Sequence, residues 1–125
     1  MSRVQISLNV SDLAAAVTFY TRLLGAPPAK LRPGYAGFAI EDPPLKLVLN
    51  APGNGPAGTI NHLGVEVATA GEVIRAEARL AAAGLPVGPR PGTECCYARQ
   101  DKVWARDPDG LAWEYYTVLE HIGTP

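Results

Sequence analysis

This sequence is short of cysteine, of net charge and of long hydrophobic runs. Only 2 of its 125 residues are cysteine, too few for the disulfide framework of a small secreted protein, so we expect a reducing, cytoplasmic setting. With 11 Lys and Arg against 12 Asp and Glu, the net charge is −1, which argues against nucleic acid or an anionic membrane as a partner. No apolar run approaches the roughly 20 residues of a membrane span. Residues 1–5 also lack the apolar segment of a signal peptide.

The composition is otherwise that of a globular protein, and its first half reads as one strand, one helix and further strands. Residues 4–10 alternate apolar and polar side chains, which predicts a half-buried strand. Ser11 is a suitable helix N-cap, apolar residues at helical spacing follow it, and Gly25 ends the helix. The other strands predicted in this half are a short one near Lys30 and two at 35–40 and 45–49.

The second half repeats this order. Residues 60–67 alternate like the first strand, and Thr69 with Glu72 has the spacing of a capping box. Gly84 ends the predicted helix. Further strands are predicted at 95–99, 103–106 and 111–118.

The two halves can be aligned with Gln5 on His62, and residues 52–56 read as the linker between them. We therefore predict two βαβββ modules, about residues 1–51 and 58–120, within a single domain over residues 1–125. The fold class is α+β, with helices on one face of a curved mixed sheet.

Strand parity places three metal-capable side chains on the inner face of this sheet. Alternate residues of a strand face opposite sides, so Gln5, His62 and Glu114 lie opposite the helix-facing apolar residues. Taken singly, the glutamine could be a solvated surface residue, the histidine a structural one and the glutamate an edge charge. Together, a carbonyl oxygen, an imidazole and a carboxylate suit a divalent first-row metal with open positions.

The repeat also predicts a fourth ligand position, which Val48 occupies. Aligning the two halves places Val48 opposite Glu114, with its side chain on the inner face. Valine cannot bind a metal, so three protein ligands would leave coordination positions for oxygen or substrate, unlike a closed structural site.

The two cysteines are neighbours, Cys95 and Cys96, and a hydrophobic core gives no reason for such a pair. A chance doublet and a vicinal disulfide in a tight turn are the plain alternatives to a functional pair. Adjacent residues of a regular strand point to opposite faces. For the thiols to bind one atom, the segment before Tyr97 must be an irregular and mobile loop, and the glycine- and proline-rich residues 88–92 favour this.

These features resemble the vicinal oxygen chelate superfamily, which includes glyoxalase I, extradiol dioxygenases and bleomycin-resistance proteins. The resemblance covers nearly the whole chain and rests on the paired modules, on Asn61-His62-Leu63-Gly64 and on Asp107-Pro108-Asp109-Gly110 before Trp113-Glu114. Residues 93–102 and the opening strand, with glutamine where most relatives have histidine, are similar to a narrower branch. That branch contains the carbon–arsenic lyases and proteins named as cadmium-induced.

The resemblance implies an Fe(II)- and O2-dependent enzyme that cleaves the carbon–arsenic bond of trivalent organoarsenicals. Methylarsenite and aromatic arsenicals would be its substrates, and arsenite the product. Gln5, His62 and Glu114 would hold the iron, and Cys95 with Cys96 would hold the arsenic, which is soft and thiophilic. Tyr116, on the strand face of Glu114, either lines the pocket or packs in the core.

Several alternatives stay open at this point. One is a non-catalytic protein that binds cadmium or arsenite through the cysteines, and another is a glyoxalase-like or thiol-transferase enzyme using Ni, Mn or Zn. The thiol pKa would fall beside a cation, for which Arg90, Arg99 and Lys102 are candidates. The superfamily builds its clefts within one chain or across a homodimer, and with Gln5, His62 and Glu114 in one chain we expect an intrachain site.

Overall fold

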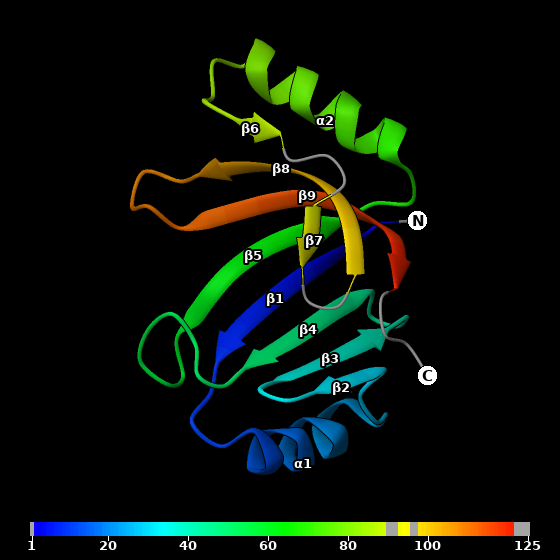
Figure 1. Cartoon of the computed structure of the whole chain (residues 1–125), viewed down its shortest axis with the longest axis vertical. Helices are drawn as coiled ribbons and strands as arrows, with labels where there is room; N and C mark the ends of the chain where they lie inside the picture. The colour runs from blue at the N-terminus through cyan, green and yellow to red at the C-terminus, as the bar shows by residue number, and fades with distance from the viewer. Residues whose placement is uncertain (1, 90–92, 96–97, 122–125) are drawn as a thin grey trace. The chain divides into compact units, whose positions relative to one another are not determined.

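The computed structural model describes residues 2–89, 93–95 and 98–121, and the chain divides into two compact units. The N-terminal unit is Arg3–Leu63, and the C-terminal unit is Gly64–Pro125 together with Met1–Ser2. The elements in chain order (Figure 1) are β1 (Arg3–Asn9), α1 (Leu13–Leu24), β2 (Lys30–Arg32), β3 (Tyr35–Ile40), β4 (Leu45–Asn50), β5 (Ile60–Glu66), α2 (Ala70–Ala82), β6 (Gly88–Pro89), β7 (Thr93–Cys95), β8 (Ala98–Arg106) and β9 (Ala112–His121). This order confirms the expected α+β class with a strand–helix–strand repeat. That residues 1–125 act as one domain stays a prediction.

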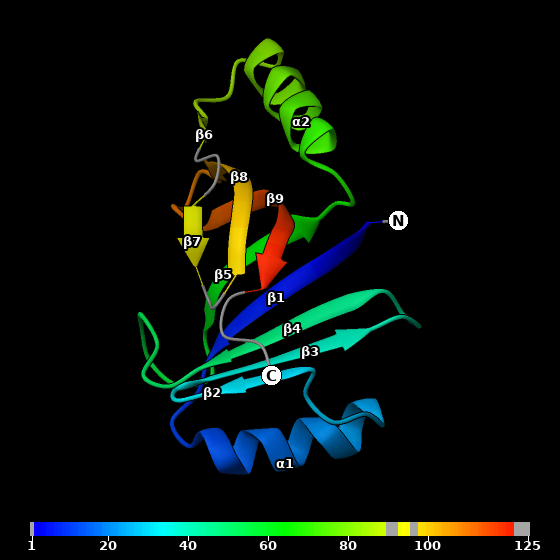
Figure 2. The ribbon, with the colours of Figure 1, turned by 45° about the vertical axis from the view of Figure 1, so that its right-hand side comes forward.

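The sheet of the N-terminal unit has an apolar face covered by α1. Its strand order is β2-β3-β4-β1, with β1 parallel to β4 and the other pairs antiparallel. The buried core residues of this unit are Ala36, Phe38, Ile40, Leu47 and Leu49. Helix α1 packs on β3 and β4 (Figure 2), and the ring of Tyr20 lies 6.5 Å from that of Phe38. The predicted alternation is confirmed, because Ile6 and Leu8 pack against this core.

Helix α1 begins one residue later than predicted. Asp12, and not Ser11, is the N-cap, and its Oδ1 accepts a hydrogen bond of 3.1 Å from the backbone N–H of Ala15. A carboxylate at this position also interacts favourably with the helix dipole, which serine cannot match. The helix ends as predicted at Gly25, whose φ of 73° is the left-handed conformation that glycine adopts without steric cost.

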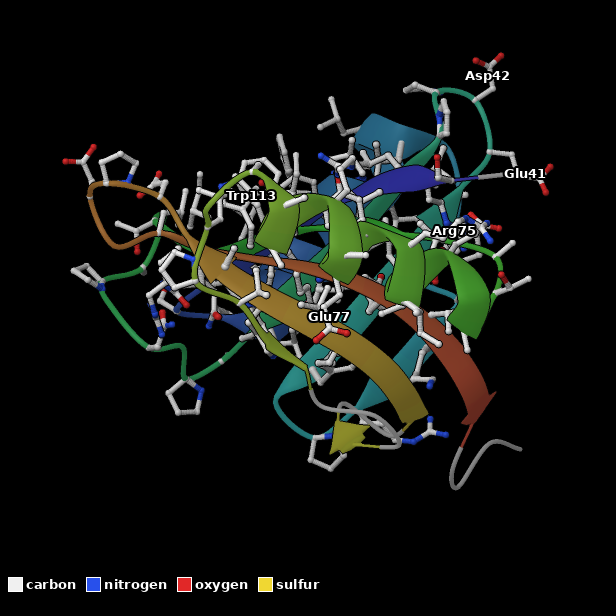
Figure 3. The ribbon with its side chains drawn as sticks, turned by 90° about the horizontal axis from the view of Figure 1, so that it is seen from above. Glu41, Asp42, Arg75, Glu77 and Trp113 are labelled. Carbon is white, nitrogen blue, oxygen red and sulfur yellow. The ribbon has the colours of Figure 1, made fainter. Side chains whose placement is uncertain are left out.

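The C-terminal unit places α2 on the β8–β9 hairpin. Val67, Val73 and Val103 are its buried core, and Tyr115 packs against them. The predicted capping box at the start of α2 is confirmed in part, since Thr69 Oγ1 accepts a hydrogen bond of 3.2 Å from the Glu72 N–H. Figure 3 looks onto this helix, from which Arg75 and Glu77 project.

The strands that follow α2 differ from the prediction. The sequence predicts separate strands at 95–99 and 103–106, whereas β8 runs without a break from Ala98 to Arg106 and β7 is a short separate strand. The polar residues 100–102 suggest an interruption, but their backbone pairs with β9 throughout, with a bulge between Arg99 and Gln100. Strand β6 was not predicted, because Gly88–Pro89 has low strand propensity and is held by pairing with Val103 and Trp104.

Candidate metal centre

The face of the N-terminal sheet opposite α1 is polar, and its side chains are buried. Gln5, Ser7 and Asn9 of β1 are 5%, 0% and 1% exposed. Polar groups this deep need hydrogen-bond partners, and Ser7 Oγ accepts one of 2.8 Å from Asn50 Nδ2. The alternative that Gln5 is a solvated surface residue is therefore wrong.

Gln5 and His62, which the repeat placed at equivalent positions, are brought together by β1 and β5. The Nε2 atoms of the two side chains lie 3.1 Å apart, and His62 Nδ1 lies 2.8 Å from Asn61 Oδ1. An amide nitrogen can only donate, so His62 Nε2 accepts from Gln5 and His62 Nδ1 donates to Asn61. The lone pair on His62 Nε2 is the one that would bind a metal, and a half-turn of the Gln5 amide would present its oxygen at the same place.

Val48 lies on this polar face, as predicted. It pairs with Ser7 across β1 and β4 and with Gly37 across β3 and β4, and it is 3% exposed. A buried valine offers no donor atom here. The sheet therefore leaves one inward position without a ligand, which is the arrangement expected for a site with open coordination.

Glu114 lies in the C-terminal unit and forms a buried ion pair. Its Oε1 is 3.0 Å from Lys102 Nζ, and both side chains are 4% exposed. The β8–β9 register pairs Trp104 with Glu114 and Lys102 with Tyr116, so these four side chains share one face of the hairpin. The Lys102 ammonium also lies 5.2 Å from the centre of the Trp104 ring. Tyr116 is 1% exposed.

The sequence predicts Lys102 only as a cation near the cysteines, whereas the structure pairs it with Glu114. The pairing register of the β8–β9 hairpin is the feature from which this ion pair can be predicted. The turn at residues 107–110, closed by the Gly110 N–H to the Asp107 carbonyl, brings 102 and 114 to one face. Two buried opposite charges at this distance hold each other in place.

The backbone at Cys95 is regular, so the expectation of an irregular loop up to Tyr97 is wrong for residues 93–95. Strand β7 pairs antiparallel with β8, with Cys95 opposite Ala98. The strand is held by backbone pairing with residues 98–100, which the Gly- and Pro-rich composition of residues 88–92 does not indicate. Cys96 and Tyr97, like the side chain of Cys95, lie outside the described residues, so the arrangement of the two thiols stays a prediction.

In the part of the chain that the structure describes, no three side chains of the His, Cys, Asp and Glu types cluster to hold a metal ion. The predicted set depends on a glutamine, which is not of these types. It also takes Gln5 and His62 from one unit and Glu114 from the other. The trio therefore stays a predicted ligand set. Within the same described ranges, no helix is long and apolar enough to cross a membrane.

Comparison with known proteins identifies relatives for almost the whole chain. Residues 2–115 match the model of the Glyoxalase/Bleomycin resistance protein/Dioxygenase superfamily. The chain is 61% identical over 120 residues to the cadmium-induced protein CadI of Mycobacterium tuberculosis, covering 95% of this chain and 78% of the relative. It is 52% identical over 118 residues to a trivalent organoarsenical cleaving enzyme of Thermomonospora curvata, covering 94% and 78%.

A solved structure supports the fold. The Mn(II)-bound glyoxalase of Novosphingobium aromaticivorans matches with a TM-score of 0.65 at 21% identity, over 100% of this chain and 43% of that one. At this identity the likeness concerns the fold alone, and it agrees with the mixed sheet and two helices described above.

Proposed function

The chain belongs to the Glyoxalase/Bleomycin resistance protein/Dioxygenase superfamily, and from this premise we propose that it cleaves the carbon–arsenic bond of trivalent organoarsenicals and releases arsenite. The observation that carries the proposal is the Gln5–His62 pair, in which Asn61 takes the Nδ1 proton and the His62 Nε2 lone pair is directed at Gln5. A superfamily fold hosts many reactions, so the reaction has to be argued from the site. The substrate class is suggested by the T. curvata relative, which is named for cleaving trivalent organoarsenicals, and by the cysteine doublet.

Three side chains are proposed to hold Fe(II): Gln5 through its amide oxygen, His62 through Nε2 and Glu114 through its carboxylate. The donor set is of the borderline-to-hard type that Fe(II) accepts, and Asn61 behind His62 is the kind of outer partner that orients a ligating imidazole. Fe(II) bound there would supply the activation of O2. All three ligands come from one chain, so the proposal does not require a second copy.

Cys95 and Cys96 are proposed to bind the substrate. Methylarsenite carries two exchangeable hydroxyl groups on arsenic and one methyl group. Each thiol replaces one hydroxyl, forming an As–S bond and releasing one water, so that two thiols leave only the As–C bond intact. A third thiol would have no group left to replace, which fits a chain with 2 cysteines.

The overall reaction balances with one O2 as the oxidant and needs no added reductant. Methylarsenite, CH3As(OH)2, and O2 give arsenous acid, As(OH)3, and formaldehyde. Carbon is oxidised by four electrons, O2 is reduced by four, and arsenic stays trivalent. We therefore expect one formaldehyde for each arsenite released.

An anaerobic experiment tests the proposal. The purified protein is loaded with Fe(II), mixed with methylarsenite and then exposed to air, and arsenite is followed by chromatography. We expect arsenite only when Fe(II), O2 and protein are all present, and we expect protein loaded with Zn(II) to release none. Absence of arsenite from the complete mixture would overturn the proposal.

A second candidate function is binding without catalysis, which the similarity to the cadmium-induced relative favours. In that case the cysteines would hold Cd(II) or arsenite and nothing would be turned over. Tight Cd(II) binding together with no arsenite release from methylarsenite would support this alternative. A glyoxalase-like reaction is disfavoured by Val48, which stands where such a site would use a carboxylate.

A further inference from the structure

We propose that the segment joining the two modules, residues 51–59, sets the tautomer of His62 through a chain of hydrogen bonds in which Asn9 and Asn61 are positioning residues. All residues of this hydrogen-bond chain belong to the N-terminal unit. The existence of this hydrogen-bond chain is independent of the reaction, and its consequence for Fe(II) binding rests on the proposed function.

The hydrogen-bond chain starts at Thr59. The hydroxyl of Thr59 donates to the carbonyl oxygen of Pro56 at 2.6 Å. A hydroxyl has a single proton, so toward its other partner Thr59 Oγ1 can only accept. That partner is the side-chain nitrogen of Asn9, Nδ2, at 2.9 Å.

The orientation of the Asn9 amide follows. With Nδ2 donating to Thr59, its Oδ1 faces two donors, the backbone N–H of Asn54 at 3.1 Å and Asn61 Nδ2 at 3.0 Å. A backbone N–H cannot accept, so Asn54 assigns the same orientation independently of Thr59. Asn9 is 1% exposed, which makes a reversed amide costly, because buried polar groups would then face like groups without water.

The last link reaches the imidazole. Since Asn61 Nδ2 donates to Asn9, Asn61 Oδ1 must face His62 Nδ1, 2.8 Å away, and accept its proton. His62 is thereby held with Nδ1 protonated and with its Nε2 lone pair directed toward Gln5. The position of one proton on His62 is thus decided by Pro56 and Asn54, both outside the strands that carry the predicted ligands.

The backbone keeps this segment against β1. The Asn9 N–H donates to the Thr59 carbonyl at 2.9 Å, and the Gly58 N–H donates to the Asn9 carbonyl at 2.7 Å. Gly53 closes over the Asn9 side chain so tightly that a Cβ there would collide with Asn9 Oδ1 and Cγ. At Gly55, two residues further on, a Cβ would lie 3.5 Å from Asn9 Nδ2 and 3.6 Å from Thr59 Oγ1, which are ordinary contacts.

These two glycines provide a matched test, since neither has a positive φ that alanine would resist. The readout is the pair of ring 15N chemical shifts of neutral His62 in metal-free protein. The chain has 2 histidines, and His121→Gln assigns the signals. We expect wild type and Gly55→Ala to show protonated Nδ1 with bare Nε2. We expect Gly53→Ala, which displaces the Asn9 amide, to shift the population toward protonated Nε2.

Asn61→Ala provides a second variant should Gly53→Ala fail to fold, because it removes the acceptor of the Nδ1 proton directly. It should shift the tautomer in the same direction and weaken anaerobic Fe(II) binding by about 10–100-fold, the usual cost of losing an outer-shell partner. A wild-type His62 protonated on Nε2 would overturn the inference, as would an unchanged tautomer in both Gly53→Ala and Asn61→Ala. Failure of the arsenite assay with the expected tautomers would instead overturn the proposed reaction and leave the hydrogen-bond chain standing.

Discussion

Replacing either Cys95 or Cys96 by serine is expected to abolish arsenite release while leaving Fe(II) binding almost unchanged. Trivalent arsenic is thiophilic, and a serine hydroxyl has no advantage over water as its ligand. The second thiolate binds within the same molecule, so its loss should weaken arsenical binding by about 10²–10⁴-fold, the usual gain from a second linked contact. Fe(II) binding should persist, because no thiol belongs to the proposed iron ligands.

The measurements are arsenite release and anaerobic Fe(II) titration on the two single variants and on the double variant. The double variant should be no worse in turnover than either single variant, because one missing thiol already prevents chelation. Full activity in either single variant would show that the two thiols do not act together. A parallel loss of Fe(II) would place a cysteine among the metal ligands instead.

The second large effect concerns the buried pair of Lys102 and Glu114. Replacing Glu114 by alanine should remove the metal and also destabilise the protein by about 3–5 kcal/mol, the usual cost of leaving one buried charge without its partner. The two side chains are each 4% exposed, with Nζ and Oε1 3.0 Å apart, so solvent can do little to replace the missing charge. Loss of stability alone could therefore imitate loss of a ligand.

A double-mutant cycle separates the two causes. Glu114→Leu combined with Lys102→Met removes both charges and should restore much of the stability, since apolar replacement of a buried pair is often neutral or favourable. It should not restore Fe(II) binding. Lys102→Met alone should be destabilised without metal but should gain more stability from Fe(II) than wild type, because the metal supplies the positive charge that the lysine no longer provides.

Urea unfolding with and without Fe(II) measures all four proteins of this cycle. Fe(II) stabilisation of the double variant equal to that of wild type would exclude Glu114 as a ligand. If Lys102→Met gained no more from Fe(II) than wild type, the lysine and the metal would not share the carboxylate.

The sequence by itself determined the elements whose signals are local. Alternation along residues 4–10 and 60–67 predicted the faces of β1 and β5, and Gly25 and the Thr69 capping box predicted helix ends. The repeat also aligned Gln5 with His62, and the structure places the Nε2 atoms of these two side chains 3.1 Å apart. These signals depend on side-chain period and on backbone conformation within a few residues, and both can be read directly from the chain.

Only the tertiary structure decided which strands and which side chains pair. Pairing with β8 makes the backbone regular up to Cys95, where local composition indicated a loop. The hairpin register joins Lys102 to Glu114, and Asn9 joins the 51–59 segment to His62 through Asn61. A hydrogen bond or ion pair depends on which atoms meet at about 3 Å. The order of the residues does not say which atoms lie at that distance, because this depends on how the strands pair.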